Sequence, residues 1–467
     1  DADFSTFRAQ GNWQAALGIT KRVPHLSHMT LKGEAKRDWP GSIFYQAPWY
    51  KEFKSIEDHF ARINSVLTRG NRETKIAVVH PVESMWVRFT PDDVSLSERK
   101  RLDDEFSALA EMLLYSLLDF DYLAESDLPR QTVECSGSRL RVGKAGYEAV
   151  LVPDMLTIRS TTLDILERFN ENGGRVIFAG SAPYLVDGRR SDRALKLSKK
   201  CVTVPFESES IISALDALRD IDITYEDGKR SDNLFYQLRN DGDIKYLFIT
   251  HVRRSDISRE RYLIRISGEY YAELYDTENG RMYSLPAKHG NNSTVISWDC
   301  GGEDSILLKL SKAKSELPVF SPRREPETVR TIKDISSFKL HEDNMLLLDY
   351  ARFSVDGGKV HEGNEILRAE NMIRKQLGFF ERTGMDMQPY ATDKKETHTV
   401  KLYYEFCSDI NTDAKLGIED PDRRKITLNG VAVDNTPIGT YVDDFIKVID
   451  LPGIYKGKNV LIIETEY

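Results

Sequence analysis

Histidine, carboxylate, arginine and tryptophan side chains are concentrated between residues 25 and 49 of the sequence. These residues are His25, His28, Glu34, Arg37, Asp38, Trp39 and Trp49. Sugar-binding loops combine aromatic rings, which cover the apolar face of a pyranose, with charged and amide groups that bind its hydroxyls, and this stretch has both. A buried aromatic cluster explains the composition equally well.

Glu34 and Asp38 are the carboxylates of this stretch that could act in catalysis. Cleavage of a glycosidic bond uses two carboxyl groups about 5 to 10 Å apart, one as acid and one as nucleophile or base. Both residues lie in a loop beside Lys36 and Arg37, so a surface ion pair is the competing interpretation. We expect the remaining residues of the stretch to bind substrate, namely His25, His28, Arg37, Trp39 and Trp49.

Strands and helices alternate in the segment 73–230, which must position any chemistry at its strand ends. The runs 75–81, 147–153 and 175–180 are short, apolar and closed by proline or glycine, as is typical of buried parallel strands. Apolar residues spaced three and four apart predict helices over 95–118 and 160–172. Ser95, three residues before Glu98, predicts a capping box. The alternation predicts an α/β domain built on an open parallel sheet.

The sequences YEAVLVPD (147–154) and NGGRVIFAG (172–180) give this segment a family resemblance. It resembles the class I glutamine amidotransferase-like fold, as used in the trimerisation domain of β-galactosidases. The resemblance implies a nucleophilic cysteine in the turn after a strand, but Ser181 occupies that turn and no His-x-Glu pair follows it. We therefore expect a domain kept for packing, for homo-oligomer formation or for covering a neighbouring site, and we disfavour amidotransferase-type hydrolysis.

The segment 1–72 carries a second resemblance, in NWQAALGITKRVPHLSH (12–28) and GEAKRDWPGSIFYQAPWYKEFKSIEDHFARIN (33–64). These runs resemble the end of the catalytic barrel in α-L-rhamnosidase-like glycoside hydrolases. The resemblance implies a last barrel strand over 22–30 and a connecting helix over 51–70. A complete β/α barrel takes about 250 residues, so we expect this chain to lack a complete active site.

Two all-β segments are predicted downstream. Short strands separated by turn residues between 231 and 315 predict an antiparallel sandwich, with a hairpin at Asn279-Gly280. Residues 311–331 have the composition of a linker. The segment 316–467, with KITLNG (425–430) and a helix inserted at 364–376, resembles the galactose-binding-like jelly roll of glycoside hydrolases. Its acidic residues predict either a structural calcium site or a solvated face: Asp420, Asp422, Asp443 and Asp444.

Composition narrows the class of protein. A chain of 467 residues is too long to fold around a single hydrophobic core, so several domains are expected. A net charge of −9 argues against nucleic-acid binding. The apolar runs are too short for a membrane span. Four scattered cysteines predict neither a disulfide framework nor a metal site, which favours a cytoplasmic protein. The first residue is aspartate and no signal peptide follows, so we expect that an upstream segment is missing and that the chain continues beyond Tyr467.

The function predicted from these patterns is the accessory portion of a glycoside hydrolase that acts on plant or microbial polysaccharide. The parent enzyme would hydrolyse the O-glycosidic bonds, with carbohydrate as partner and with no cofactor besides the calcium ion considered above. A stand-alone carbohydrate-binding or scaffolding protein is the alternative. The fold class predicted is α/β plus all-β, with a parallel-sheet amidotransferase-like domain followed by β-sandwich domains.

Overall fold

The computed structural model describes residues 3–25, 27–33, 36, 43–91, 93–131, 133–253, 258–321, 339–340, 343–382 and 397–467. The chain forms two compact units. The central unit comprises residues 2–23 and 54–324, and the C-terminal unit comprises residues 1, 24–53 and 325–467. The fold is mixed, with one five-stranded parallel sheet and several antiparallel sheets.

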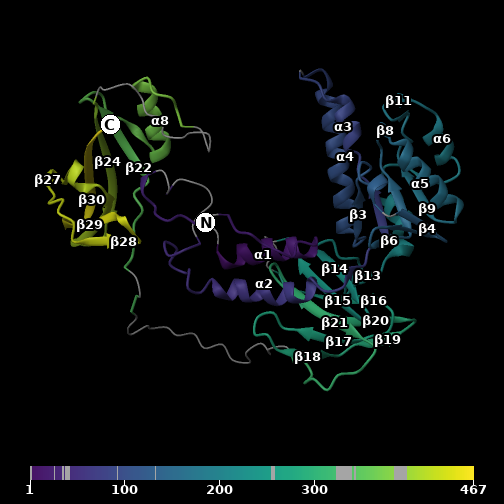
Figure 1. Ribbon diagram of the computed structural model, residues 1–467. Coiled ribbons are helices and arrows are strands. Elements are labelled where there is room, and N and C mark those ends of the chain that lie inside the picture. The colour runs from purple at the N-terminus through teal and green to yellow at the C-terminus, as the bar shows by residue number, and fades with distance from the viewer. Residues whose placement is uncertain are drawn as a thin grey trace. The chain divides into compact units, whose positions relative to one another are not determined.

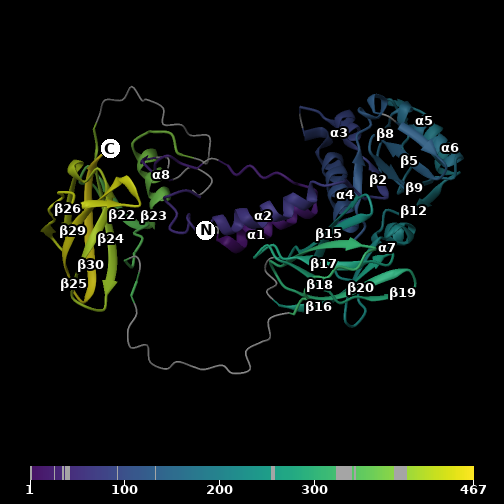
Figure 2. The ribbon, with the colours of Figure 1, turned by 60° about the horizontal axis from the view of Figure 1, so that its bottom comes forward.

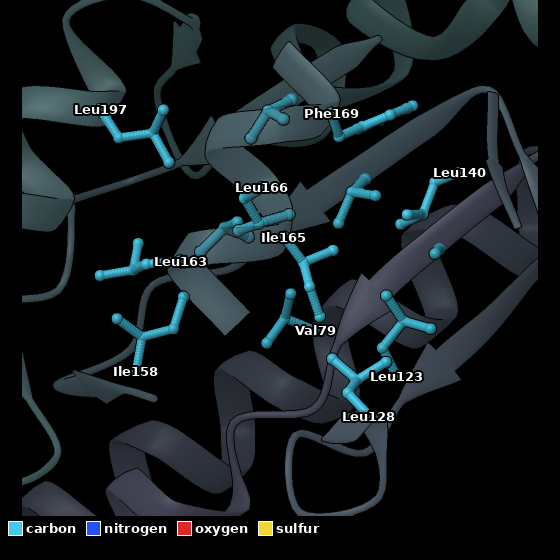
Figure 3. Packing of buried hydrophobic residues seen from close by; sticks show 14 of the residues in the cluster. Val79, Leu123, Leu128, Leu140, Ile158, Leu163, Ile165, Leu166, Phe169 and Leu197 are labelled. Atoms are coloured by element: carbon cyan, nitrogen blue, oxygen red, sulfur yellow. The ribbon is translucent and has the colours of Figure 1, made fainter. Parts of the chain in front are cut away.

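The parallel sheet of the central unit has the strand order β12-β9-β7-β2-β3. Its strands are β2 (Ile76–Val79), β3 (Phe120–Leu123), β7 (Ala149–Val152), β9 (Arg175–Ala179) and β12 (Val202–Val204). Every residue of β2 and β7 is buried, because helices cover both faces of the sheet. On one face α5 (Ser160–Glu171) contributes Leu163, Leu166 and Phe169 to the core (Figure 3). On the other face lie α4 (Leu96–Tyr115) and α7 (Ser208–Leu215).

The order of the strands fixes where a ligand is expected. β2 comes first in the chain, β3 pairs on one side of it, and β7, β9 and β12 follow on the other side. The chain therefore reverses direction across the sheet between β2 and β7. Open parallel sheets bind ligands at such a switch point, beyond the carboxyl ends of the strands.

Short elements surround the parallel sheet (Figure 1). The sequence of residues 82–94, with Trp86 and Pro91, predicts a loop, but after β2 the chain forms α3 (Val82–Arg88). Further pieces of the domain are β4 (Val133–Ser136), β5 (Arg139–Val142), β6 (Ala145–Tyr147), β8 (Thr157–Ile158), β10 (Leu185–Val186), β11 (Arg189–Arg190) and α6 (Arg193–Ser198). Ser95 stands before α4 as predicted, but its hydroxyl donates to the Arg88 carbonyl instead of capping the helix.

Two antiparallel sheets complete the central unit and share one apolar core. The six-stranded sheet has the order β1-β14-β15-β21-β17-β18, and the four-stranded sheet has the order β13-β16-β20-β19. Their bounds are β1 (Asn71–Arg72), β13 (Ile221–Tyr225), β14 (Leu234–Asp241), β15 (Ile244–His251), β16 (Glu260–Ser267), β17 (Tyr271–Tyr275), β18 (Met282–Leu285), β19 (Lys288–Gly290), β20 (Ser293–Cys300) and β21 (Ser305–Ser311). The expected hairpin at Asn279-Gly280 joins β17 to β18.

Two helices lie side by side against the outer face of the six-stranded sheet (Figures 1 and 2). They are α1 (Phe4–Ala16) and α2 (Lys54–Leu67), and α2 lies within the range 51–70 where a connecting helix is expected. Gln237 of β14 donates to the Ala15 carbonyl at 2.6 Å, so β14 is buried on both faces. The helices approach closely because Gly11 has no side chain, and a Cβ atom there would lie 2.1 Å from Cζ of Phe60.

The described residues of the C-terminal unit form two antiparallel sheets and the α-helix α8 (Ile366–Gln376) (Figure 2). The larger sheet has the order β23-β22-β24-β30-β26-β27, and the smaller has the order β25-β29-β28. Their bounds are β22 (Tyr350–Val355), β23 (His361–Glu365), β24 (Thr399–Ser408), β25 (Thr412–Glu419), β26 (Arg424–Leu428), β27 (Val431–Ala432), β28 (Gly439–Tyr441), β29 (Asp443–Ile454) and β30 (Gly457–Glu466). The inserted helix is α8 (Ile366–Gln376), close to its expected position.

Two strands expected from the sequence are wrong. Residues 22–25 and 27–30 contain no strand, because Pro24 lacks an N–H group and side chains bind this stretch. The apolar run 345–350 also predicts a strand, but residues 345–349 contain none, and β22 begins only at Tyr350. The prolines Pro322 and Pro326 of the expected linker lie outside the described residues. None of the helices in the described ranges has the length and apolar character needed to cross a membrane.

Candidate functional site

Three of the seven predicted site residues fall in the described part of the chain. His25 is exposed, whereas His28 and Trp49 are half-buried. The His28 carbonyl accepts a hydrogen bond from Gln46 Nε2 at 2.8 Å, and the Trp49 ring packs on Phe53 with centroids 5.7 Å apart. The other four predicted residues lie outside the described residues: Glu34, Arg37, Asp38 and Trp39.

A buried carboxylate from the far end of the chain holds this segment. Asp443, at the start of β29, is only 3% exposed. Its Oδ1 accepts hydrogen bonds from Thr30 Oγ1 at 2.9 Å and from Phe445 N at 3.0 Å. Its Oδ2 accepts from Leu31 N at 2.8 Å and lies 3.1 Å from the Tyr45 hydroxyl. We call this set, Asp443 with Thr30, Leu31 and Tyr45, the Asp443 clamp.

A second carboxylate supports the same segment. Glu419, the last residue of β25, accepts from Gly33 N at 3.1 Å and pairs with Lys36 Nζ at 3.0 Å. The Lys32 ammonium lies 4.5 Å from the centre of the Phe445 ring. Backbone N–H groups of residues 31 and 33 are therefore bound by side chains of two neighbouring strands, β25 and β29.

The electrostatics of Asp443 follow from its burial and its donors. Burial alone would raise the pKa of this carboxyl, but the hydrogen bonds from Phe445, Leu31, Thr30 and Tyr45 together lower it below its usual value. The ionised form is thus the stable one when the clamp is closed. A carboxylate has about four lone-pair sites, and here four donors point at them.

Backbone strain occurs directly beside the clamp. Val442 has φ of +62°, a conformation that β-branched residues rarely adopt, and the pairing of β28 with β29 shifts register at this point. Such strain costs about 1 to 3 kcal/mol and persists where the surrounding structure imposes it. The position of Asp443 is therefore maintained against a local preference of the chain.

Aromatic side chains lie next to the clamp on the same segment. The Phe44 ring contacts Tyr45 and Tyr50 edge-on, with centroids 5.2 and 6.1 Å apart. Phe44 is 48% exposed and Tyr45 is 38% exposed, so the rings are not enclosed in a core. Exposed aromatic rings therefore lie beside polar groups in this segment, whereas Trp49 is half-buried and packs on the buried Phe53.

The acidic residues considered for calcium do not share one environment. Asp420, Asp422 and Asp444 are exposed, as a solvated face requires, whereas Asp443 is buried and bound by donors. The described ranges contain no group of three or more His, Cys, Asp or Glu side chains arranged to hold a metal ion. A calcium ion at these aspartates stays a prediction.

The turn after β9 was the other place where sequence reasoning looked for a nucleophile. Gly180 adopts φ of +91° there, and the following residue, Ser181, is exposed. Among the described residues no histidine forms a hydrogen bond with Ser181. Within the described ranges, no imidazole base is therefore placed to activate the Ser181 hydroxyl group.

No family model matches the sequence. No curated protein matches it either. Solved structures similar to the chain include glycoside hydrolases. A rhamnosidase from Novosphingobium sp. PP1Y aligns with a TM-score of 0.47 and 15% identity over 99% of this chain and 42% of that chain. A catalytic mutant of Gan42B, a GH42 beta-galactosidase from G. stearothermophilus, aligns with a TM-score of 0.46 and 10% identity over 66% and 51% of the two chains.

An alpha-L-fucosidase, isoenzyme 2 from Paenibacillus thiaminolyticus, aligns with a TM-score of 0.39 and 11% identity over 67% of this chain and 58% of that chain. This chain thus spans less than two thirds of the length of each of these three structures.

Proposed function

We propose that this chain is the accessory, non-catalytic portion of a glycoside hydrolase that acts on plant or microbial polysaccharide. In this proposal the C-terminal domain holds a sugar-facing loop in place, and the parent enzyme carries out the hydrolysis. The observation that carries the proposal is the Asp443 clamp, which binds the loop by three donors from residues 30–45.

The clamp supports a positioning role because it uses costly features for one purpose. A buried charge is retained only where donors compensate its lost hydration, and Asp443 meets that condition through the loop. The strain at Val442 adds to the cost. Substrate-binding side chains work only when held in a fixed geometry by supporting residues, and a brace of this kind provides that support.

The chemistry of the described residues also favours an accessory role. Asp443 cannot serve as an acid or base while four donors occupy it. Ser181 has no histidine partner among the residues that the structure describes. The resemblance of residues 12–64 to the rim of a hydrolase barrel supports substrate contact by the loop, with the rest of the barrel supplying the catalytic carboxylates.

Calorimetric titration and turnover assays on this chain test the proposal. We expect binding of rhamnose- or galactose-containing oligosaccharides without hydrolysis of the matching nitrophenyl glycosides. Asp443→Asn should weaken that binding about tenfold or more, which corresponds to about 1.4 kcal/mol, and Trp49→Ala should weaken it similarly. Asp444→Asn is the matched control, because it removes the same charge from an exposed neighbour.

Three outcomes would overturn the proposal. Turnover by the isolated chain would show that it contains its own active site. Equal effects of the Asp443 and Asp444 substitutions would show that the clamp does not position the sugar. Absence of both binding and turnover would contradict a sugar-facing role.

A further inference from the structure

A cleft of about 460 Å³ opens at the switch point of the parallel sheet. Its walls come from the segments that follow four strands: α3 after β2, the turn after β3, the β8–α5 segment after β7, and the β10–β11 turn after β9. α3 and β8 lie together at this edge (Figures 1 and 2). The lining residues that matter here are Glu83, Trp86, Pro129, Thr157, Arg159 and Asp187. The volume is within the range of ligand sites in proteins.

Hydrogen bonds join the two sides of the switch point. Ser84 of α3 is fully buried, and its hydroxyl oxygen accepts from Leu156 N at 3.0 Å and from Thr157 N at 3.2 Å. The Glu83 carboxylate pairs with Arg159 Nε at 2.7 Å across the same gap. The cleft is therefore formed in advance of any ligand, which lowers the entropic cost of binding.

A buried carboxyl group binds the backbone N–H of Arg159 and holds it in place. Glu125 follows β3, is 3% exposed, and its Oε2 accepts from Arg159 N at 2.8 Å. Burial raises the pKa of Glu125 to about 7, and the nearby charge of Glu83 acts in the same direction. This residue orients the arginine and does not line the cleft.

The β10–β11 turn, which forms another wall of the cleft, has a defined conformation. Asp187 and Gly188 have φ of +50° and +72°, and Asp187 Oδ1 accepts from Ser160 N at 2.9 Å. Gly188 N donates to Thr157 Oγ1 at 3.1 Å. The hydroxyl and carboxylate groups on this side are thus held at fixed positions along the cleft.

The chemistry of the lining selects a class of ligand. The Trp86 indole is 62% exposed in the free chain, which leaves a large aromatic surface available. Glu83 offers acceptors and Arg159 offers donors at one place, the combination that binds neighbouring hydroxyl groups. The lining has two carboxylates and one guanidinium group, a balance that favours a neutral ligand over an anionic one.

We propose that this cleft binds a neutral pyranose oligosaccharide, with one sugar on the Trp86 indole and its hydroxyls on Glu83 and Arg159. The choice of carbohydrate rests on the proposed function of the chain. The residues that line the cleft are all different from residues 24–53, so the cleft adds a second place where the accessory portion binds polysaccharide.

Hydrogen exchange and calorimetry on the full chain test the cleft, with galactotetraose as the neutral probe and tetragalacturonic acid as its anionic counterpart. We expect galactotetraose to protect residues 82–91 from exchange and to bind about tenfold tighter than the acid. Trp86→Ala should weaken binding about tenfold or more, and Trp86→Phe should retain most of it. Trp13→Ala is the matched control, because Trp13 is 43% exposed on α1, outside the cleft.

Glu83→Gln provides a second, independent readout. This change frees the Arg159 guanidinium from its ion pair, so the preference for the neutral probe over the acid should narrow or reverse. An unchanged preference would contradict the assigned role of the ion pair.

The outcomes separate this proposal from the proposed function. No protection at 82–91, or equal losses in the Trp86→Ala and Trp13→Ala chains, would overturn the cleft. If Asp443→Asn abolishes binding and Trp86→Ala leaves it intact, the proposed cleft site is overturned and the proposed sugar-facing role of the loop is supported. Turnover of nitrophenyl glycosides would overturn the accessory role and leave the cleft standing.

Discussion

Replacing Asp443 with asparagine removes one acceptor oxygen from the clamp and leaves the size of the side chain almost unchanged. In the unmodified chain each carboxylate oxygen accepts from a backbone N–H and lies near a hydroxyl group. Oδ1 faces Phe445 N and Thr30 Oγ1, and Oδ2 faces Leu31 N and the Tyr45 hydroxyl. The amide of asparagine has one acceptor oxygen and one donor nitrogen. In either orientation its NH2 group faces a backbone N–H that cannot turn away.

The expected cost follows from the hydrogen bonds that are lost. A hydrogen bond to a charged group contributes about 1.5 to 3 kcal/mol, and an unpaired buried donor adds to the penalty. The hydroxyls can reorient, so the unavoidable loss is one charged hydrogen bond together with one N–H···H–N contact. We expect about 3 kcal/mol, which increases the opening equilibrium of the loop roughly 100-fold.

Hydrogen exchange of the Leu31 amide measures this opening directly. The Asp443→Asn chain should exchange at Leu31 about 100-fold faster than the unmodified chain, and the Asp444→Asn control should stay within about threefold of it. Protonation should act like the substitution. Because the folded-state pKa of Asp443 lies below its usual 3.8, the clamp is present above that value and is lost as pH falls through the lower one. Equal rates in both variants would refute the clamp.

Three further changes have expected outcomes. Burial raises the pKa of Glu125 from 4.5 to about 7, so its contribution to stability is present below 4.5 and is lost as pH rises through 7. Between pH 4.5 and 7, the free energy of unfolding of the unmodified chain should therefore fall by about 3 kcal/mol relative to that of the Glu125→Gln chain, as measured by urea unfolding. His59, whose pKa burial lowers to about 3, titrates in both chains and affects both equally. A pH-independent difference would contradict the shift. Val442→Gly should stabilise the C-terminal unit by about 1 kcal/mol in thermal unfolding, because glycine adopts φ of +62° without strain; a loss of stability would show that the valine side chain matters more. Gly11→Ala should destabilise the central unit by about 2 kcal/mol in urea unfolding, since its Cβ would lie 2.1 Å from the Phe60 ring, and Phe60→Leu should recover part of that loss unless the two changes are additive.

The elements predicted correctly are those whose signal is local and repeated. β2, β7 and β9 are apolar runs with both faces buried, and α2, α4, α5 and α8 have apolar faces of helical period. The hairpin between β17 and β18 was recognisable from Asn279-Gly280. In each case the residues that determine the element lie within the element itself.

The elements missed are short or depend on distant partners. β3 at the edge of the parallel sheet reads Phe-Asp-Tyr-Leu, and its polar residue hides the strand pattern. Asp121 is polar at this position because it pairs with Arg72 of β1 and accepts from the Tyr147 hydroxyl. α3 has seven residues, too few for a periodic signal. The cleft beside α3 therefore could not be predicted from the sequence.

The clamp was invisible to sequence reasoning for a related reason. Thr30, Leu31 and Tyr45 are separated from Asp443 by 413, 412 and 398 residues. In sequence Asp443 resembles the exposed Asp444 beside it, so the pair predicts a solvated acidic face or calcium ligands. Without residues 30–45 the buried carboxylate would keep only Phe445 N as a described donor, which is too little to compensate its desolvation. The loop and β29 must therefore form together, and the domain that supports the loop is in turn stabilised by it.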